Sequence, residues 1–276
     1  MAENGFGPVE FWAELLSLPL AVFLWGKWYW QSFRVRTSGL GRAGRTVLQL
    51  TPLVCGVVLY LVLRRFAAQD VRLNSSYQTL YMLLGAAWLG VVERAAFRLG
   101  LSARDDVLER HNPAAAVALS GLMLGSNFAF AGANIGNGPG AWVVVFCGLL
   151  ATSGLFASWW ALDALTGLAD AITVDRDFAS GLRAAGFFIG SGLILGRAVA
   201  GDWQSVIGTI VDFVKYGWPL VLLWAVALGG EQMLQPTPSR PRSPVLSHGL
   251  LPALLFLGLG ALTVFVSGPR LGLFRQ

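Results

Sequence analysis

The sequence predicts an all-α, polytopic transmembrane helix bundle of about eight helices. Of the 276 residues, 55% are hydrophobic and only 13% are charged, whereas soluble domains carry about 25% charged residues. Apolar runs of about 20 residues, the length that spans a bilayer, follow one another along the chain. The 11 Trp also fit a membrane protein, because indole rings favour the bilayer interfaces. The net charge of +5 therefore indicates membrane orientation, and nucleic acid is not an expected partner.

Eight apolar segments are each long enough to cross a bilayer. They cover residues 9–30, 46–66, 77–98, 113–135, 140–165, 178–200, 204–229 and 247–268. The short links leave no room for a soluble domain. Residues 230–246 form a Pro/Ser-rich linker that we expect to be irregular. We therefore divide the chain into an N-terminal two-helix segment (1–76), a core (77–230), and a linker with the last helix (231–276).

Basic residues concentrate in the first, third and seventh links. These residues are Lys27, Arg34, Arg36, Arg42, Arg45, Arg94, Arg98, Arg104, Arg110, Arg240 and Arg242. Links rich in Lys and Arg stay in the cytoplasm, so we expect both termini outside. Arg64 and Arg65, in the second link, oppose this orientation. The first apolar run lacks the basic start of a signal peptide, so we expect a retained helix.

A shift of 65 residues aligns two stretches of the chain. The polar entries VLERHN and ITVDRD coincide, and Asn112 falls on Asp177. This self-similarity predicts two copies of a helix pair, at about residues 105–168 and 170–230. Two crossings separate the copies, so they have the same membrane orientation. We expect a pseudo-twofold axis along the membrane normal.

Glycines occur at matching positions of the two copies. Gly121 and Gly125 have small-xxx-small spacing, as do Gly186 and Gly190. This spacing lets helix backbones approach closely in lipid. We expect a packing seam between the fourth and sixth segments, with a moving interface as the functional alternative.

Asp212 and Lys215 lie near the middle of the seventh segment, three residues apart and so on one helical face. A lone charge at the bilayer centre costs about 2.5–3.5 kcal/mol on insertion scales, so such residues pair or face a polar cavity. Either they neutralise each other and hold helices together, or they line a path for an ion, proton or solute. Pro219 allows a kink beside them. A retinal Schiff base on Lys215 is disfavoured by the eight-helix count, and no cofactor is expected.

Asn127 and Asn134 lie seven residues apart on one face of the fourth segment. They either hydrogen-bond neighbouring helices or offer polar groups to a solute or cation.

An interfacial charge cluster lies at the cytoplasmic ends of the fifth and sixth segments. Its members are Asp163, Asp170, Asp175, Asp177 and Arg183. We interpret it as solvated charge with one or two salt bridges, or as a gate or docking surface.

Motifs for enzyme chemistry are not found. The sequence has no HExxH, CxxC or nucleophile elbow. Cys55 and Cys147 lie inside apolar runs, and His111 and His248 lie at separate interfaces. We therefore expect no metal site and no enzymatic activity.

The stretch HNPAAAVALSGLMLGSNFAFAGANIG resembles the "gN-A-A---G--lG" pattern of bacterial YjfL-type membrane proteins, which carry tandem copies of a domain of unknown function numbered 350. The matching residues are Asn112, Ala114, Ala116, Gly121 and Gly125 in the first copy, and Asp177, Ala179, Gly181, Gly186 and Gly190 in the second. Asp177 departs from the family's Asn. The resemblance covers roughly residues 80–230 and implies a multi-pass protein of the bacterial inner membrane. It implies no particular activity.

Two functions remain open at this point. The first is a transporter or channel-like protein for a small ion or solute, with a route between the copies near Asn127, Asp212 and Lys215. The second is a structural or partner-binding subunit without transport activity. The expected partners are the lipid bilayer, a small ion or solute, and further copies or other membrane subunits.

Overall fold

The computed structural model describes residues 7–35, 40–236 and 243–267. Over these residues the chain is helical and forms no strand, only an isolated bridge between Ala67 and Gly136. In the described part of the chain, seven helices are long and apolar enough to cross a membrane, or eight if one bent helix pair is counted as a single span. The predicted all-α, multi-pass bundle is confirmed.

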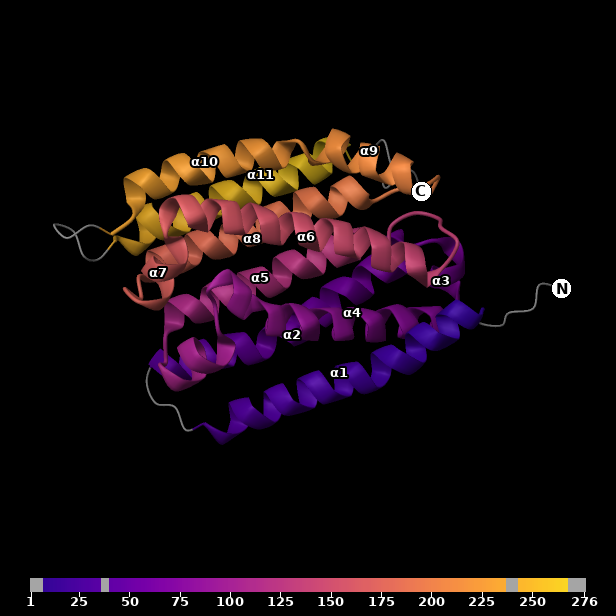
Figure 1. Ribbon diagram of the computed structural model, residues 1–276, viewed down its shortest axis with the longest axis horizontal. Coiled ribbons are helices and arrows are strands. Elements are labelled where there is room, and N and C mark those ends of the chain that lie inside the picture. Colours follow the sequence, from indigo (N-terminus) through magenta and orange to yellow (C-terminus); the bar gives the residue numbers. More distant parts are fainter. Residues whose placement is uncertain (1–6, 36–39, 237–242, 268–276) are drawn as a thin grey trace.

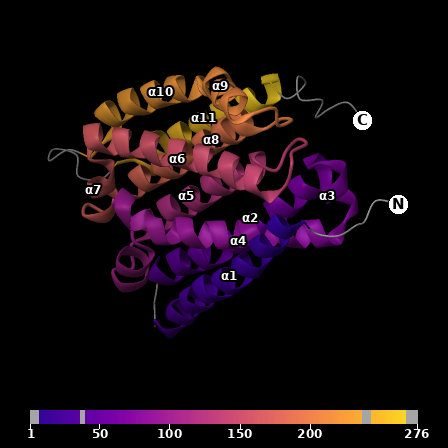
Figure 2. The same ribbon diagram turned by 45° about the vertical axis from the view of Figure 1, so that its right-hand side comes forward.

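The spans lie close to the predicted segments. They are α1 (Pro8–Arg34), α2 (Leu40–Phe66), α4 (Ser75–Ala95), α5 (Pro113–Gly132), α6 (Ala141–Thr166), α8 (Phe178–Val199), α9 (Val206–Gly217) with α10 (Pro219–Leu234), and α11 (Leu251–Ser267). Short elements cap the bundle: α3 (Gln69–Leu73), α7 (Leu168–Thr173), the 3-10 turn η1 (Ala96–Leu99) and the π-helical turns η2 (Ala103–Glu109) and η3 (Val245–Leu250). The helix α3 lies at one end of the bundle and α7 at the opposite end (Figures 1 and 2).

Four helices form one layer, in the order α2, α5, α8 and α11 (Figure 1). They run in the same direction, because later residues of one helix contact later residues of the next. For example, Gly121 of α5 faces Ala185 of α8, and Gly132 faces Gly196. The spans α4, α6 and α10 lie along this layer, and α1 packs mainly on α4 (Figure 1). The helices α6 and α8 run antiparallel, since Trp159 packs on Phe188 while Gly154, earlier in α6, faces Leu195.

The centre of the bundle is the pair α5 and α8. In their most apolar stretches, 83% and 78% of residues are buried, against 17–44% in the other unbroken spans. Large apolar side chains of the outer helices are exposed, including Leu16, Phe23, Val57, Leu61, Val221 and Phe265. Such extensive exposed apolar surface fits contact with lipid.

Glycine brings α5 and α8 together backbone to backbone. A Cβ added at Gly132 would lie 2.1 Å from the carbonyl oxygen of Gly196, and one added at Gly192 would lie 2.1 Å from that of Gly125. Only a residue without a side chain allows this approach. The interface between α5 and α8 therefore leaves no space between the two backbones at these glycines.

Gly186 and Gly190 face α11 rather than α5, meeting Ala253 and Phe256. A twofold axis between α5 and α8 would bring Gly121 and Gly186 into one interface. Instead, α5 and α8 each use different faces toward their two neighbours in the layer. The face of α5 that meets α8 corresponds to the face of α8 that meets α11, which is a head-to-tail arrangement. Gly121 and Gly125 therefore lie in the predicted seam between α5 and α8, whereas Gly186 and Gly190 lie in the next interface, with α11. The expected pseudo-twofold relation between the copies is wrong.

The seventh span is broken. The helices α9 and α10 are bent by 43°, with Pro219 at the start of α10. Proline has no N–H and disturbs the turn before it, so the kink expected from Pro219 is present. No residue of α9 is buried.

Candidate functional site

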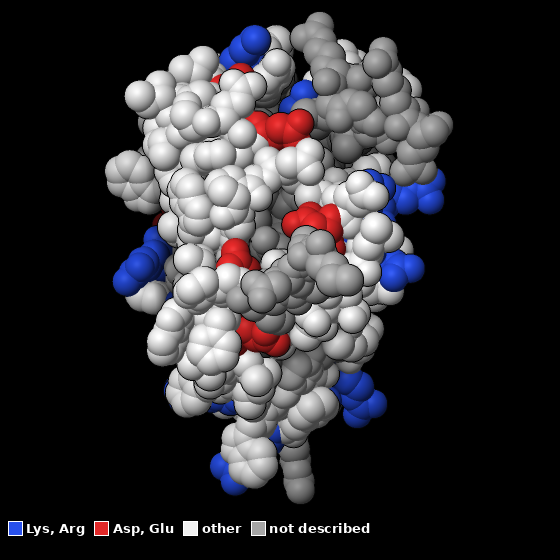
Figure 3. Space-filling model, turned by 90° about the vertical axis from the view of Figure 1, so that its right-hand side faces the viewer, with Lys and Arg blue, Asp and Glu red and all other residues white. Residues whose placement is uncertain are grey.

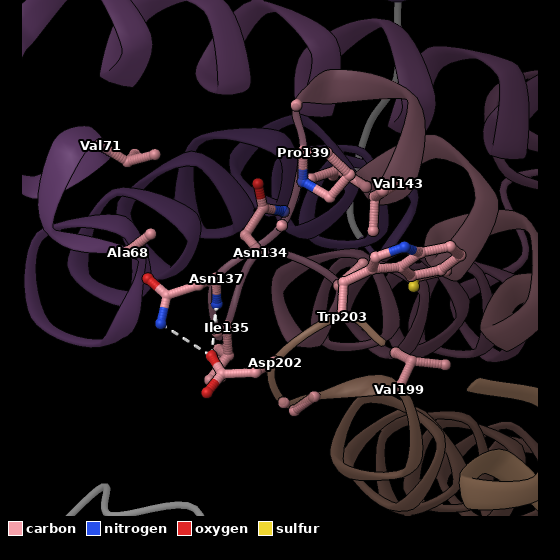
Figure 4. Close-up of a pocket in the computed structure, with 18 of the residues that line it drawn as sticks. Ala68, Val71, Asn134, Ile135, Asn137, Pro139, Val143, Val199, Asp202 and Trp203 are labelled. Carbon is pink, nitrogen blue, oxygen red and sulfur yellow. Dashed lines mark hydrogen bonds between the residues drawn. The ribbon is translucent and has the colours of Figure 1, made fainter. Parts of the chain in front are cut away.

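A pocket of about 280 Å³ opens at the end of the bundle that carries α3. We call this end the pocket end. The turns that follow α2, α5 and α8 meet the start of α1 there. Figure 3 shows this end, with acidic side chains around a hollow and basic ones toward the margin. Figure 4 shows the lining from close by.

Hydrogen bonds between two turns shape the pocket. The N–H of Gly201 donates to the carbonyl of Ile135 at 2.9 Å, and the N–H of Trp203 donates to that of Asn137 at 2.8 Å. Asp202 Oδ1 accepts from the backbone N–H and from Nδ2 of Asn137 at 2.7 and 2.8 Å (Figure 4). The Gly-rich turn after α5 is therefore held to the turn after α8.

Four carboxylates line the pocket, from Glu10, Asp70, Asp202 and Asp212, and among the described residues its lining contains no Lys, Arg or His. Glu10 is buried, and its Oε1 accepts from the N–H of Ala141 at 3.4 Å. Ala141 is the first residue of α6, and a helix N-terminus stabilises a carboxylate. The other three carboxylates are exposed. The pocket therefore has one fixed, buried negative group and three at the surface.

Asn134 lines the same pocket and is 6% exposed. Its Nδ2 donates to the carbonyl of Phe130 at 2.8 Å. Its Oδ1 has no hydrogen-bond partner among the described residues. A carbonyl can only accept a hydrogen bond, so the atom facing Phe130 is the amide nitrogen of Asn134, and the atom left without a partner is its oxygen, an acceptor.

Asp212 and Lys215 do not form the expected ion pair within the described part of the chain. Both are exposed on α9. Asp212 lines the pocket, whereas the Nζ of Lys215 lies 5.1 Å from the ring centre of Tyr216. The pair therefore separates into a pocket carboxylate and a surface ammonium.

Asn127 lies apart from this pocket. It is fully buried, and its Nδ2 donates to the carbonyl of Cys55 on α2 at 3.1 Å. It lines a second, apolar pocket. Of the four predicted path residues, only Asn134 and Asp212 share a site.

A buried ion pair lies toward the opposite end. Arg183 of α8 donates to both carboxylate oxygens of Glu231 on α10, at 2.6 and 2.8 Å, and both side chains are 1% exposed. Arg183 also donates to the Ser180 hydroxyl and to the carbonyl of His248. We expected Arg183 to belong to an aspartate cluster. The sequence offered no signal for Glu231, which lies 48 residues further along the chain and inside the predicted linker. The prediction of an irregular linker is wrong at its start, because α10 continues to Leu234.

The aspartates of the predicted cluster have separate roles. Asp177 caps α8 by accepting from the N–H of Ser180 at 2.8 Å. Asp163 accepts from the N–H of Ala169 at 2.6 Å, while Asp170 and Asp175 are exposed.

Asp106 on η2 is a further buried carboxylate, which sequence reasoning missed. Burial raises the pKa of this carboxyl, against the N–H of Ser102 and the guanidinium of Arg110, which lower it.

The fold and its apolar surface define a multi-pass membrane protein in a lipid bilayer. A family model described as Domain of Unknown Function (DUF350) matches residues 75–199, from the start of α4 to the end of α8. No curated protein and no solved structure matches the chain. The match includes the α5–α8 seam and Asn134 but ends before Asp202, Asp212 and Glu231, so the complete pocket extends beyond it.

Proposed function

We propose that the protein is a transporter or channel-like membrane protein for a small cation or cationic solute, which binds in the pocket at the pocket end. The observation that carries this proposal is the charge of the lining, which has four carboxylates and, within the described part of the chain, no basic side chain. A concave site lined by one sign of charge beside low-dielectric walls concentrates ions of the opposite sign. The free amide oxygen of Asn134 adds a neutral acceptor.

Aromatic rings favour a solute with apolar groups around its charge. Tyr77, Tyr81 and Trp203 also line the pocket. Aromatic faces attract cations, and the attraction is largest where water is excluded. A small organic ammonium therefore fits this lining better than a strongly hydrated ion.

A route from the pocket needs a moving element, because α5 and α8 are in backbone contact. The helix α9 contributes Thr209 and Asp212 to the pocket. It has no buried residue and meets α10 at a 43° bend. Broken helices line solute sites in many transporters. We propose α9 as the part that moves when solute leaves the pocket.

We also propose that the core consists of tandem copies, as in the YjfL-type arrangement. His111 and Arg176, 65 residues apart, both have a left-handed backbone, with φ of 56° and 55°. Gly136 and Gly201, again 65 apart, have φ of 108° and 143°. Matching turns before and after α5 and α8 support duplication. The family match, together with the basic links expected inside, supports the bacterial inner membrane as the location.

Uptake into liposomes tests the transport proposal. We expect the purified protein to take up radiolabelled tetraethylammonium faster than protein-free liposomes. The double variant Asp70→Asn/Asp212→Asn should lower uptake about tenfold, because it removes two surface charges from the pocket. Glu109→Gln, exposed on η2, is the matched charge control. Uptake no faster than in protein-free liposomes would overturn transport of this cation, and unchanged uptake in the double variant would overturn the pocket assignment.

A structural or partner-binding subunit is the second candidate. The backbone contacts of α5 with α8 and the buried Arg183–Glu231 pair favour it, since both hold the helices in one arrangement. This candidate requires a stably folded protein whose tetraethylammonium uptake equals that of protein-free liposomes. Under either function we propose no enzymatic activity, because the sequence carries no catalytic motif.

A further inference from the structure

A second pocket, of about 200 Å³, lies among α1, α2 and α4. We call it the lateral pocket. Its lining is Trp25, Tyr29, Pro52, Leu53, Gly56, Leu59, Met82, Gly85, Ala86, Leu89 and Asn127. Leu53 is 60% exposed on the apolar side of α2. The lateral pocket therefore borders the surface that faces lipid.

One polar atom of this lining lacks a partner. Trp25 Nε1 donates to the carbonyl of Ala86 at 2.8 Å, and the Tyr29 hydroxyl donates to that of Gln49 at 3.0 Å. Asn127 Nδ2 is bonded to the carbonyl of Cys55. Asn127 Oδ1 has no hydrogen-bond partner among the described residues, and Asn127 is fully buried. An unsatisfied buried acceptor destabilises the folded protein, so a bound donor there would be favoured.

We propose that the lateral pocket binds a lipid-soluble molecule with an apolar body and one O–H or N–H donor. The apolar walls accept the body, and Asn127 Oδ1 accepts the hydrogen bond. An acyl chain alone would leave the amide oxygen unsatisfied. A charged solute would lose its hydration on entering this pocket without gaining a counter-charge, because the described residues of its lining include no charged side chain. The proposal is independent of the cation site at the pocket end.

Photolabelling in nanodiscs tests this proposal. The probe is a long-chain alcohol with a diazirine in its tail, and its methyl ether is the matched control without a donor. We expect the alcohol to label peptides of α2 and α4 around the lateral pocket about five- to tenfold more than the ether does, which corresponds to one hydrogen bond. Asn127→Leu should remove this preference for the alcohol.

A second variant keeps the test independent of Asn127. A Cβ added at Gly56 meets only Met82 Cε, at 4.0 Å, so Gly56→Leu fills the pocket and leaves the amide in place. Labelling by both probes should fall in that variant. Asn134→Leu, at the other pocket, should change neither. Equal labelling by alcohol and ether in the parent protein, or an alcohol preference that survives Asn127→Leu, would overturn the proposal.

Discussion

Asn112 and Asp177 both cap the N-termini of their helices, α5 and α8, but their second hydrogen bonds run in opposite directions. Each accepts backbone N–H groups of its own helix. Asn112 Nδ2 then donates to the carbonyl of Ile172 at 2.8 Å, whereas Asp177 Oδ1 accepts from the N–H of Ser243 at 3.4 Å. A carbonyl needs a donor and an N–H needs an acceptor. The Asp at position 177, where the first stretch has Asn, therefore follows from its neighbour.

The Arg183–Glu231 pair leads to a prediction at the same scale. Glu231→Leu leaves a buried guanidinium without its counter-charge, so it should cost about 3–5 kcal/mol of stability. Arg183→Met should cost a similar amount. The double variant should be more stable than either single one, because no unpaired charge remains buried. Denaturant unfolding in micelles measures all three.

The exposed Arg104–Glu109 pair provides the control for this experiment. Its side chains are 69% and 54% exposed, so Glu109→Gln should change stability by about 0–1 kcal/mol. If Glu231→Leu had as small an effect as Glu109→Gln, the buried pair would contribute nothing to the fold.

Individual residues were the hardest to predict from the sequence. Spacing along one helix predicted a pair of Asp212 with Lys215, but α9 lies at the surface, where solvent or lipid headgroups leave little reason to pair. Arg183 has its partner on α10 of the next span, 48 residues along the chain, and periodicity carries no information about such a contact. Asn134 was predicted as a polar group on the fourth segment, yet it lies in the turn after α5, and its pocket is formed by turns that come together only in the fold.

Elements were predicted more fully than residues. Runs of about 20 apolar residues located the spans because a bilayer imposes that length, and Pro219 located the break. The sequence could not predict which neighbouring helix each glycine contacts. Gly186 on α8 lies next to Ala185, and both are small enough for close packing. Only the positions of α5 and α11 around α8 decide which face meets which helix.

The α5–α8 seam leads to a prediction at the element scale. Gly192→Ala puts a Cβ 2.1 Å from a backbone carbonyl oxygen that cannot move independently of α5. Overpacking of this kind costs about 1–3 kcal/mol. Unfolding in micelles should report this loss.

Gly229 is the matched control, because it lies in α10 with nothing within 4 Å of an added Cβ. Gly229→Ala should stabilise the protein by about 0.5–1 kcal/mol, since Ala is the better helix former. Equal effects at Gly192 and Gly229 would contradict a close backbone seam.

At the scale of the whole molecule, acidic side chains line the pocket at one end and a group of basic side chains lies at the other, although Arg64 and Arg65 at the end of α2 lie at the pocket end. The pocket end carries the four carboxylates of the pocket. The opposite end carries the end of α1 with Arg34, and also Arg98, Arg104 and Arg110 around η1 and η2. The sequence predicted this asymmetry as an orientation signal, because the links alternate between sides. It could not predict that the acidic residues of one side would line a pocket.

Cysteine labelling tests the orientation that follows from this asymmetry. In a background of Cys55→Ala and Cys147→Ala, both buried in the native protein, a cysteine is introduced at exposed Gln204 or at exposed Arg104. Because basic links stay in the cytoplasm, a membrane-impermeant maleimide should label Gln204→Cys in intact bacterial cells whose outer membrane has been permeabilised. Arg104→Cys should react only after the inner membrane is opened. The reverse pattern would put the acidic pocket on the cytoplasmic side, and its proposed cation would then bind from inside the cell.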